Sequence, residues 1–339
     1  MDQVRDELAV RTGGVAPTWL RRIFLINLIV QTGIIVTGAT VRVTASGLGC
    51  PTWPECTDGS IVPTSAQAEA WHKYVEFGNR LLTVVLVVAA IAALVGAIAW
   101  ARSRRAKDLR PRRPITVLSA VPLLGTVAQA LLGGVTVLTG LNPVTVAAHF
   151  LLSMTIVAGC VVLLWRAGEP GDQPVTTLVR REVLWLGTAL VALAAIVVAL
   201  GTVVTGSGPH SGDSADVGRL PIDPRMASWL HADVVLLFVG LIVAAILALR
   251  LTDSPVQAQR ASWWLAGAAV LQGVIGYVQY FTGLPEVLVL LHVLGACLVW
   301  IAVLRLRLSL RSRGLAPNAT QVEAQAGTGH PISSGASGS

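Results

Sequence analysis

Charged residues are scarce in this sequence. Only 13% of its 339 residues are Asp, Glu, Lys or Arg, and 54% are hydrophobic, whereas a soluble domain carries about 25% charged residues. Lysine occurs twice, as Lys73 and Lys107, and aromatic residues make up 5%, which excludes an aromatic-rich core. With a mean hydropathy of +0.70, these figures exclude a disordered chain and predict a polytopic membrane protein.

Several familiar motifs are missing as well. The sequence has no Walker A motif, no dinucleotide fingerprint and no nucleophile elbow, so phosphate-driven chemistry has no visible apparatus. The polar N-terminus lacks the short basic region and cleavage site of a signal peptide, so we expect the first apolar segment to remain in the mature protein. The net charge of +7 informs us about loop orientation in the lipid bilayer, and we predict no nucleic-acid partner.

Eight apolar segments are each long enough for a membrane-spanning helix of about 20 residues. They run roughly over 22–42, 74–100, 115–138, 145–166, 183–205, 228–249, 262–282 and 286–305. Arginines gather in alternate loops and after the last segment. The positive-inside rule therefore predicts a multi-pass protein of the plasma membrane with both termini in the cytoplasm.

An internal repeat relates the two halves of the chain. At an offset of 143 residues, Gln129 superposes on Gln272, Gly133 on Gly276, and His149 on His292. A weaker match pairs the segment that starts at Gly38 with the one that starts at Gly201. The predicted fold class is therefore an all-α polytopic membrane protein, with eight transmembrane helices as two pseudo-symmetric four-helix bundles.

This repeat sets the expected domain organisation. A cytoplasmic N-terminus (1–21) precedes an N-terminal four-helix unit (22–166). A cytoplasmic linker (167–182) leads to a C-terminal four-helix unit (183–305). The tail (306–339) is rich in Gly, Ser, Ala and Pro and is expected to be cytoplasmic and disordered; we assign no function to His330 within it.

Three histidines lie at matched depth, near the outer ends of their spans: His149, His231 and His292. Ionisable residues inside the membrane are costly and are functional candidates. A single intramembrane histidine is more often a packing residue, but three at one depth, two of them repeat-related, favour ligation. Two histidines on facing helices can hold a haem iron from both sides, which predicts such a pair at His231 and His292.

The second span of the first unit carries a different polar set. His72, Glu76, Asn79 and Arg80 are spaced i, i+4, i+7 and i+8, so they share one helix face. Arg80, like Arg42, could pair with a haem propionate. Two simpler interpretations stay open: an ion pair of Glu76 with Arg80 or His72 at the helix mouth, and an interfacial position for Arg42.

The cysteines form two classes. Cys50 and Cys56 lie close together in the first external loop, which favours a disulfide on an oxidising side; a free thiol pair or a metal-binding pair is the alternative. Cys160 and Cys297 lie in apolar segments and are expected to be small buried hydrophobes. His210, in a Gly- and Ser-rich loop, is expected to be a turn residue.

From about residue 20 to residue 305 the sequence resembles the haem A synthases, as an actinobacterial-like bacterial member. The motifs that carry the similarity are GATVRVTASGLGCPTWPEC (38–56), EFGNR (76–80), GTVVTGSGPH (201–210) and the repeated histidines. The resemblance implies oxidation of a methyl group of haem O to a formyl group, which gives haem A for cytochrome oxidase. It also implies haem O synthase (a farnesyltransferase) and cytochrome oxidase assembly factors as partners, with the electron acceptor and any homo-oligomer left open.

The resemblance also implies residue roles. A b-type haem, with its iron, falls between His231 and His292, and substrate haem O falls at His149. Glu76 matches the functional glutamate of the family and would accept protons or stabilise a cation at the methyl carbon. Cys50 and Cys56 match a disulfide or redox-responsive pair.

The chain departs from the family pattern at Asn79, where many members have a histidine. Either His149 alone holds the substrate haem, or His72 substitutes from about 10 Å further along the helix. Two functions from other classes remain as alternatives: a di-haem b-type electron-transfer cytochrome and a haem carrier.

Overall fold

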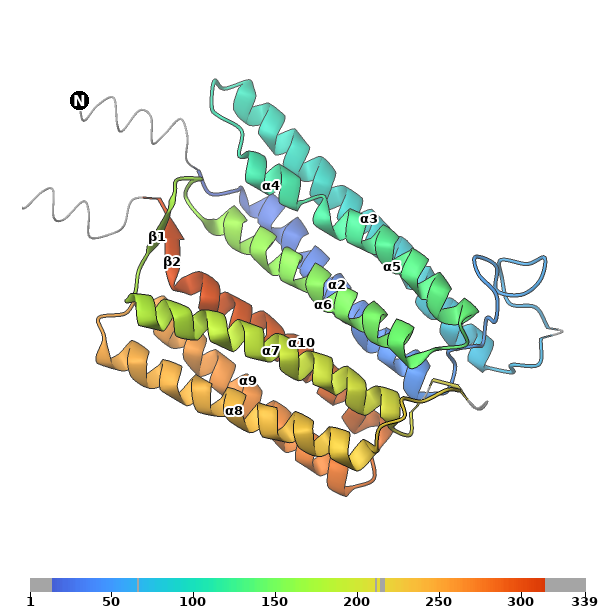
Figure 1. The fold of residues 1–339 in the computed structure, drawn as a ribbon. Helices are drawn as coiled ribbons and strands as arrows, with labels where there is room; N and C mark the ends of the chain where they lie inside the picture. Colours follow the sequence, from blue (N-terminus) through green and yellow to red (C-terminus); the bar gives the residue numbers. More distant parts are fainter. Residues whose placement is uncertain (1–13, 66, 211, 214–216, 315–339) are drawn as a thin grey trace, which may run out of the picture.

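The computed structural model describes residues 14–314 except 66, 211 and 214–216. It contains eight helical spans long and apolar enough to cross a membrane, so the predicted fold class is confirmed (Figure 1). The helices of the first unit are α2 (Thr18–Val43), α3 (His72–Arg105), α4 (Arg113–Leu118), α5 (Val121–Leu138) and α6 (Pro143–Gly168). Those of the second unit are α7 (Arg181–Ser207), α8 (Pro224–Leu251), α9 (Val256–Phe281) and α10 (Glu286–Ser309).

Local sequence explains several helix ends. Asn142 and Asp223 cap α6 and α8, because their side chains accept hydrogen bonds from the first free backbone N–H groups. A proline follows each cap, where its missing N–H costs nothing. The turns that precede α6 and α10 have the same conformation: Leu141 and Leu284, related by the repeat, both have positive φ, at 56° and 61°.

The third span is broken, although the sequence predicts one continuous helix over 115–138. Helix α4 ends at Leu118 and α5 begins at Val121. Pro122, in the first turn of α5, cannot donate a backbone hydrogen bond to the turn before it. Elsewhere the helices extend past the predicted limits, as in α3, which continues to Arg105. Hydropathy marks only the apolar part of a helix.

A short antiparallel sheet was not predicted. Strand β1 (Val175–Thr177) in the linker pairs with strand β2 (Arg311–Arg313) after α10. The first part of the tail, which we expected to be disordered, therefore has regular structure, because its backbone finds partners in the linker. His330 lies outside the described residues.

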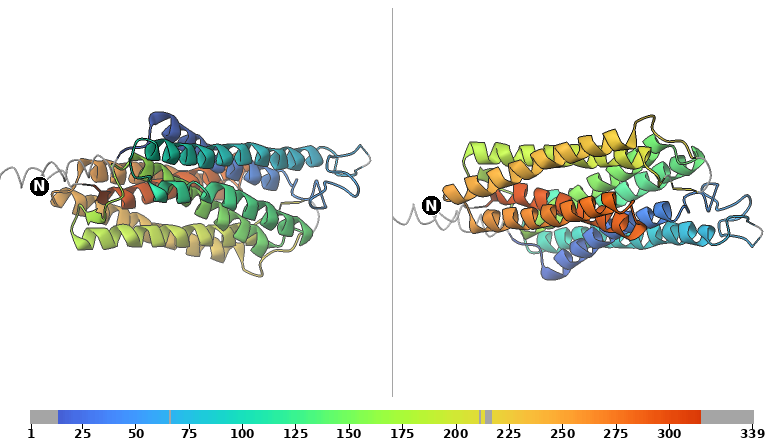
Figure 2. Two further views of the ribbon diagram at one scale, coloured as in Figure 1. Left: turned by 90° about the horizontal axis from the view of Figure 1, so that it is seen from above. Right: turned by 90° about the horizontal axis from the view of Figure 1, so that it is seen from below.

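The helices of both units run side by side along the length of the molecule (Figure 2). Within each unit, the contacts between spans place the four at the corners of a square. In the first unit, α3 and α6 occupy opposite corners; in the second, α8 and α10 do. The units meet through α2 and α6 on one side and α7 and α10 on the other. At this interface Cys297 Sγ lies 4.0 Å from Met154 Sδ. These residues differ by the repeat offset of 143, so a pseudo-two-fold axis passes between them.

The ends of the bundle differ in content. Gly14, near the N-terminus, donates a backbone hydrogen bond to Pro170 O (2.5 Å), at the end that also holds β1 and β2 (Figure 1). The loops 44–71 and 208–223 lie at the opposite end. Large apolar side chains such as Leu124, Leu236 and Phe281 are exposed on the outer faces, as expected of helices that contact lipid.

Candidate functional site

The three intramembrane histidines share one environment. His149, His231 and His292 lie in the halves of α6, α8 and α10 nearest the loop end opposite the termini. In each imidazole the Nδ1 atom is buried and has no hydrogen-bond partner among the described residues. The Nδ1 side of each ring lies against a glycine of a neighbouring helix, so a partner group would bind at the other ring nitrogen, Nε2.

The second unit carries a histidine on each of two opposed helices. His231 and His292 lie in the same half of the diagonally opposed helices α8 and α10. Two neutral imidazoles that face each other across a bundle are a suitable axial ligand set for haem iron. In the first unit, α6 carries His149, and the diagonally opposed helix α3 carries Asn79 and no second intramembrane histidine.

Two of these histidines each accept, at the backbone carbonyl, a hydrogen bond from a glutamine side chain. Gln129 Nε2 donates to His149 O (2.9 Å), and Gln272 Nε2 donates to His292 O (2.8 Å). In the first unit, Ser153 Oγ also donates to His149 O (3.1 Å). The repeat seen in the sequence is therefore a repeat of contacts.

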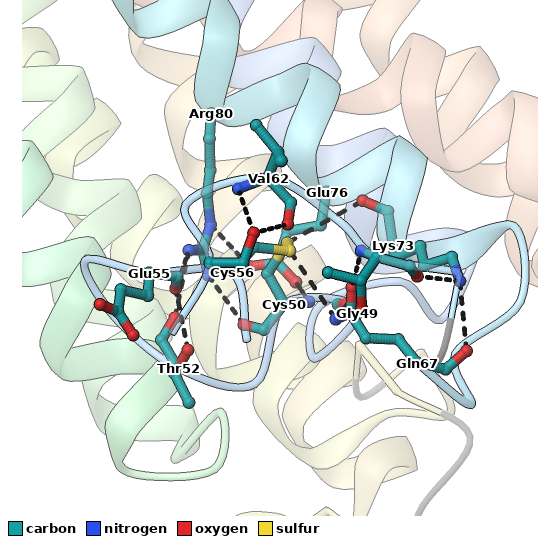
Figure 3. The surroundings of a disulfide bond; sticks show 12 residues. Gly49, Cys50, Thr52, Glu55, Cys56, Val62, Gln67, Lys73, Glu76 and Arg80 are labelled. Carbon is teal, nitrogen blue, oxygen red and sulfur yellow. Dashed lines mark hydrogen bonds and ion pairs between the residues drawn. A yellow bond between two sulfur atoms is a disulfide. The ribbon is translucent and has the colours of Figure 1, made fainter. Parts of the chain in front are cut away.

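Glu76 is the centre of the polar cluster in the first unit. Its side chain is buried within α3, and Oε2 accepts a hydrogen bond from the backbone N–H of Cys50 (2.6 Å). Oε1 accepts from Arg80 Nε (3.1 Å) and Nη2 (2.6 Å). The i, i+4 ion pair at the helix mouth therefore exists, and it is joined to the loop between α2 and α3 (Figure 3).

Arg80 connects α3 to that loop. Its Nη1 donates to the carbonyls of Thr52 and Glu55 (both 3.1 Å), and its Nη2 donates to Cys50 O (2.8 Å). Together with the two bonds to Glu76, these occupy the five N–H donors of the guanidinium. In this arrangement Arg80 organises the loop and has no N–H free for a propionate.

The loop between α2 and α3 contains a disulfide between Cys50 and Cys56, both buried. Figure 3 shows the disulfide between Arg80 on one side and Lys73 on the other. Lys73 is buried and donates from Nζ to Thr64 O (2.8 Å) and Gln67 O (3.2 Å). The cysteine pair and Glu76 are thus parts of one hydrogen-bonded unit.

The remaining predicted residues have other partners. His72 Nδ1 lies 2.9 Å from Ser46 Oγ, and its ring stacks on Trp71 at 4.1 Å. Asn79 Oδ1 accepts from Thr37 Oγ1 (2.8 Å). These contacts hold His72 at the start of α3, seven residues from Asn79.

Arg42 joins the two units. Its Nε donates to His210 O (2.6 Å) and its Nη2 to Thr205 O (2.8 Å). His210 Nε2 in turn lies 3.1 Å from Leu284 O. Arg42 therefore links α2 to the loop after α7, and its Nη1 has no hydrogen bond to a described residue.

Sequence reasoning missed a set of uncharged polar residues in the first unit. Gln31 on α2 is buried and donates from Nε2 to Thr126 Oγ1 on α5 (3.1 Å). Asn27 is fully buried, and its Oδ1 lies 3.9 Å from Cys160 Sγ. A search restricted to ionisable residues does not find them; amides within an apolar span were the available signal.

The donor set fits haem better than a bare metal ion. Over the described parts of the chain, no three His, Cys, Asp or Glu residues form a group that could hold an ion. A haem needs only the axial nitrogens, because the porphyrin supplies the other iron ligands. The paired histidines of the second unit therefore fit a haem.

Comparison with known proteins gives the same direction. A family profile described as COX15-CtaA, cytochrome oxidase assembly protein, matches residues 21–210. Proteins named heme A synthase from Geobacillus kaustophilus and Lysinibacillus sphaericus are 31% and 32% identical over 117 and 131 residues. These matches cover 34% and 38% of this chain. They cover 32% and 39% of the length of those two proteins.

A longer match extends over most of the chain. A protein named heme A synthase from Bacillus cereus (strain AH187) is 26% identical over 327 residues, which are 91% of this chain and 97% of that protein. These relatives give no support to the actinobacterial placement expected from the sequence. Because the family profile covers more than half of its length, the chain belongs to the COX15-CtaA family of cytochrome oxidase assembly proteins.

Proposed function

We propose that this protein is a haem A synthase, a membrane oxidoreductase that oxidises a methyl group of haem O to a formyl group. The observation that carries the proposal is the difference between two units of one plan. The second unit has a histidine on each of two diagonally opposed helices, His231 and His292. The first has His149 and, on the opposed helix α3, a buried carboxylate, Glu76. Such a difference suits one resident haem and one reacting haem.

In the second unit, His231 and His292 would hold a b-type haem. A haem bound there supplies one-electron redox chemistry. Apolar side chains such as Leu190, Phe238 and Leu265 form the core of this unit. This role needs stable ligation and no proton chemistry, and the described residues of the unit offer both histidines without a buried carboxylate.

In the first unit, His149 would bind the iron of the substrate, haem O. Glu76 would accept a proton or stabilise positive charge that develops at the methyl carbon. A carboxylate has about four acceptor positions, and Cys50 N and Arg80 fill three of them. Glu76 is thus fixed in place while one acceptor position remains for the substrate.

The cellular setting follows from this assignment. We place the protein in the plasma membrane with both termini in the cytoplasm, so that Glu76 and the histidines lie in the outer half of the bilayer. The substrate would come from haem O synthase, a farnesyltransferase, and the product would pass to cytochrome oxidase assembly factors. Arg42, whose Nη1 has no hydrogen bond to a described residue, is the better of the two candidate arginines for a propionate.

Haem extraction tests the proposal. The chain is produced in cells that make haem O but no haem A, and the extracted haems are separated by chromatography. We expect haem A from the wild-type chain. We expect a decrease of about 100-fold or more from Glu76→Gln, the range for loss of a positioned acid–base group. Glu286→Gln, at an exposed residue at the start of α10, is the matched control and should keep full product.

The alternatives predict a different result. A di-haem electron-transfer cytochrome or a haem carrier would return haem O unchanged from the wild-type chain. Full haem A formation by Glu76→Gln would support the synthase activity but show that Glu76 has no role in the reaction.

A further inference from the structure

Each intramembrane histidine rests on a glycine of a neighbouring helix. A Cβ atom added to Gly133 of α5 would lie 3.2 Å from His149 Cε1, and one added to Gly276 of α9 would lie 3.1 Å from His292 Cε1. At Gly201 of α7, the corresponding distance to His231 Cε1 is 3.5 Å. We call these three positions glycine seats, because the ring lies where a side chain would otherwise be.

The repeat supplies a fourth seat, at Gly38. Gly38 of α2 aligns with Gly201 of α7. Among the described residues, no atom lies within 4 Å of the position that a Cβ of Gly38 would take. The glycine is present in both units, but only the second unit places an imidazole on it.

Residues next to this seat offer a free hydrogen-bond donor. Asn79, on the adjacent helix α3, uses its Oδ1 to accept from Thr37, the neighbour of Gly38. Its Nδ2 group makes no hydrogen bond to any other residue in the described ranges, and the side chain is only partly buried. The carboxamide therefore keeps two N–H groups for an acceptor.

No side chain of the described residues lies within 4 Å of the Cβ position of Gly38, where the missing imidazole would rest. His72, the nearest histidine on α3, is engaged with Ser46 and Trp71, and it lies about 10 Å away along the helix. His149 approaches from the opposite corner of the unit and already has its own seat at Gly133.

We infer that Gly38, Thr37 and Asn79 form a binding site for one small neutral ligand, of the size of water or imidazole, that hydrogen-bonds with the Asn79 carboxamide. This inference rests on the proposed function, since the ligand would occupy the open face of the haem held by His149. The site gives the first unit an exchangeable position that the second unit lacks.

Imidazole is the probe that tests the site. Purified protein loaded with haem is titrated with imidazole while its absorption and electron paramagnetic resonance spectra are recorded. In the wild type, the haem that is lost in His149→Ala should change from high spin to low spin. The haem held by His231 and His292 should stay low spin throughout.

Three variants make the assignment specific. Gly38→Leu fills the seat and should weaken the imidazole response about tenfold or more, since overpacking costs roughly 1–3 kcal/mol. Gly33→Leu, at an exposed position of the same helix, should respond like the wild type. Asn79→His should be low spin without imidazole.

The outcomes separate the two levels of the proposal. If the His149-dependent haem is present but ignores imidazole, or responds equally in Gly38→Leu, the ligand site is wrong and the proposed function stands. If no haem depends on His149, both are wrong.

Discussion

The two four-helix units have the same plan but different interiors. Asn27 and Gln31 of α2 align with Leu190 and Ala194 of α7, which are buried in the apolar core of the second unit. Thr126 of α5 aligns with Ala269 of α9, which packs against that core. The first unit thus places amides and a hydroxyl where the second places aliphatic side chains.

This difference teaches where specificity is needed. Apolar packing holds helices together but does not select one helix register over another. Hydrogen bonds between membrane helices, in contrast, join particular residues. In the first unit, α2 contacts α5 through Gln31 and Thr126 and contacts α3 through Thr37 and Asn79. A unit that must admit and release a substrate benefits from contacts that reform in one register.

The largest effect should come from breaking the histidine pair. His231→Ala or His292→Ala removes one axial ligand, and we expect nearly complete loss of the low-spin haem from the purified protein. His149→Ala should leave that haem in place and remove only the second one. The pyridine haemochrome assay and the low-spin absorption band measure both. Equal loss from all three variants would show that the units do not hold separate haems.

Exchanging aligned core residues between the two units tests the difference between their interiors. Leu190→Asn puts an amide into the apolar core of the second unit, and we expect a loss of about 3 kcal/mol in unfolding free energy from the cavity and the unpaired polar group. The reciprocal change, Asn27→Leu, should alter stability by less than about 1 kcal/mol, because Asn27 Nδ2 has no partner among the described residues. Denaturant unfolding in detergent measures both. Equal costs would refute the assignment of different interiors.

Most of the fold could be predicted from the sequence, because hydropathy and the repeat report directly on span number and symmetry. The break between Leu118 and Val121 and the pairing of β1 with β2 could not. Both depend on backbone partners far apart in the chain or on a local proline, and neither changes mean hydropathy.

The sequence predicted which residue types form the candidate site, but not the hydrogen bonds that connect them. The spacing of Glu76 and Arg80 indicates an ion pair, and the structure contains it. The bonds from Arg80 to the carbonyls of Thr52, Glu55 and Cys50 depend on the path of the loop, which no periodicity encodes. Contacts between repeat-equivalent residues, such as Met154 with Cys297, also require the packed structure.

A smaller effect should separate the two glutamine contacts. In Gln272→Leu, the His292 carbonyl loses its side-chain donor, since Ala296 stands where the first unit has Ser153. We expect about tenfold weaker haem retention, the lower end of the effect of outer-shell changes, with a shifted electron paramagnetic resonance spectrum. Gln129→Leu should do less to the other haem, because Ser153 still donates to His149 O.

The control for this difference is Gln129→Leu combined with Ser153→Ala, which gives the first unit the donor set of Gln272→Leu. If the single and double variants in the first unit behave alike, Ser153 does not support the histidine backbone.

The smallest effect concerns the hydrogen bond between Gln31 and Thr126. A double-mutant cycle with Gln31→Ala and Thr126→Ala, the residues of the second unit, isolates this contact. We expect a coupling energy of about 0.6 kcal/mol, the average for hydrogen bonds between membrane helices, measured by unfolding in detergent. Zero coupling would mean that the hydrogen bond between Gln31 and Thr126 adds nothing to stability, and the comparison of the two interiors would then have to rest on a role of these side chains other than stability.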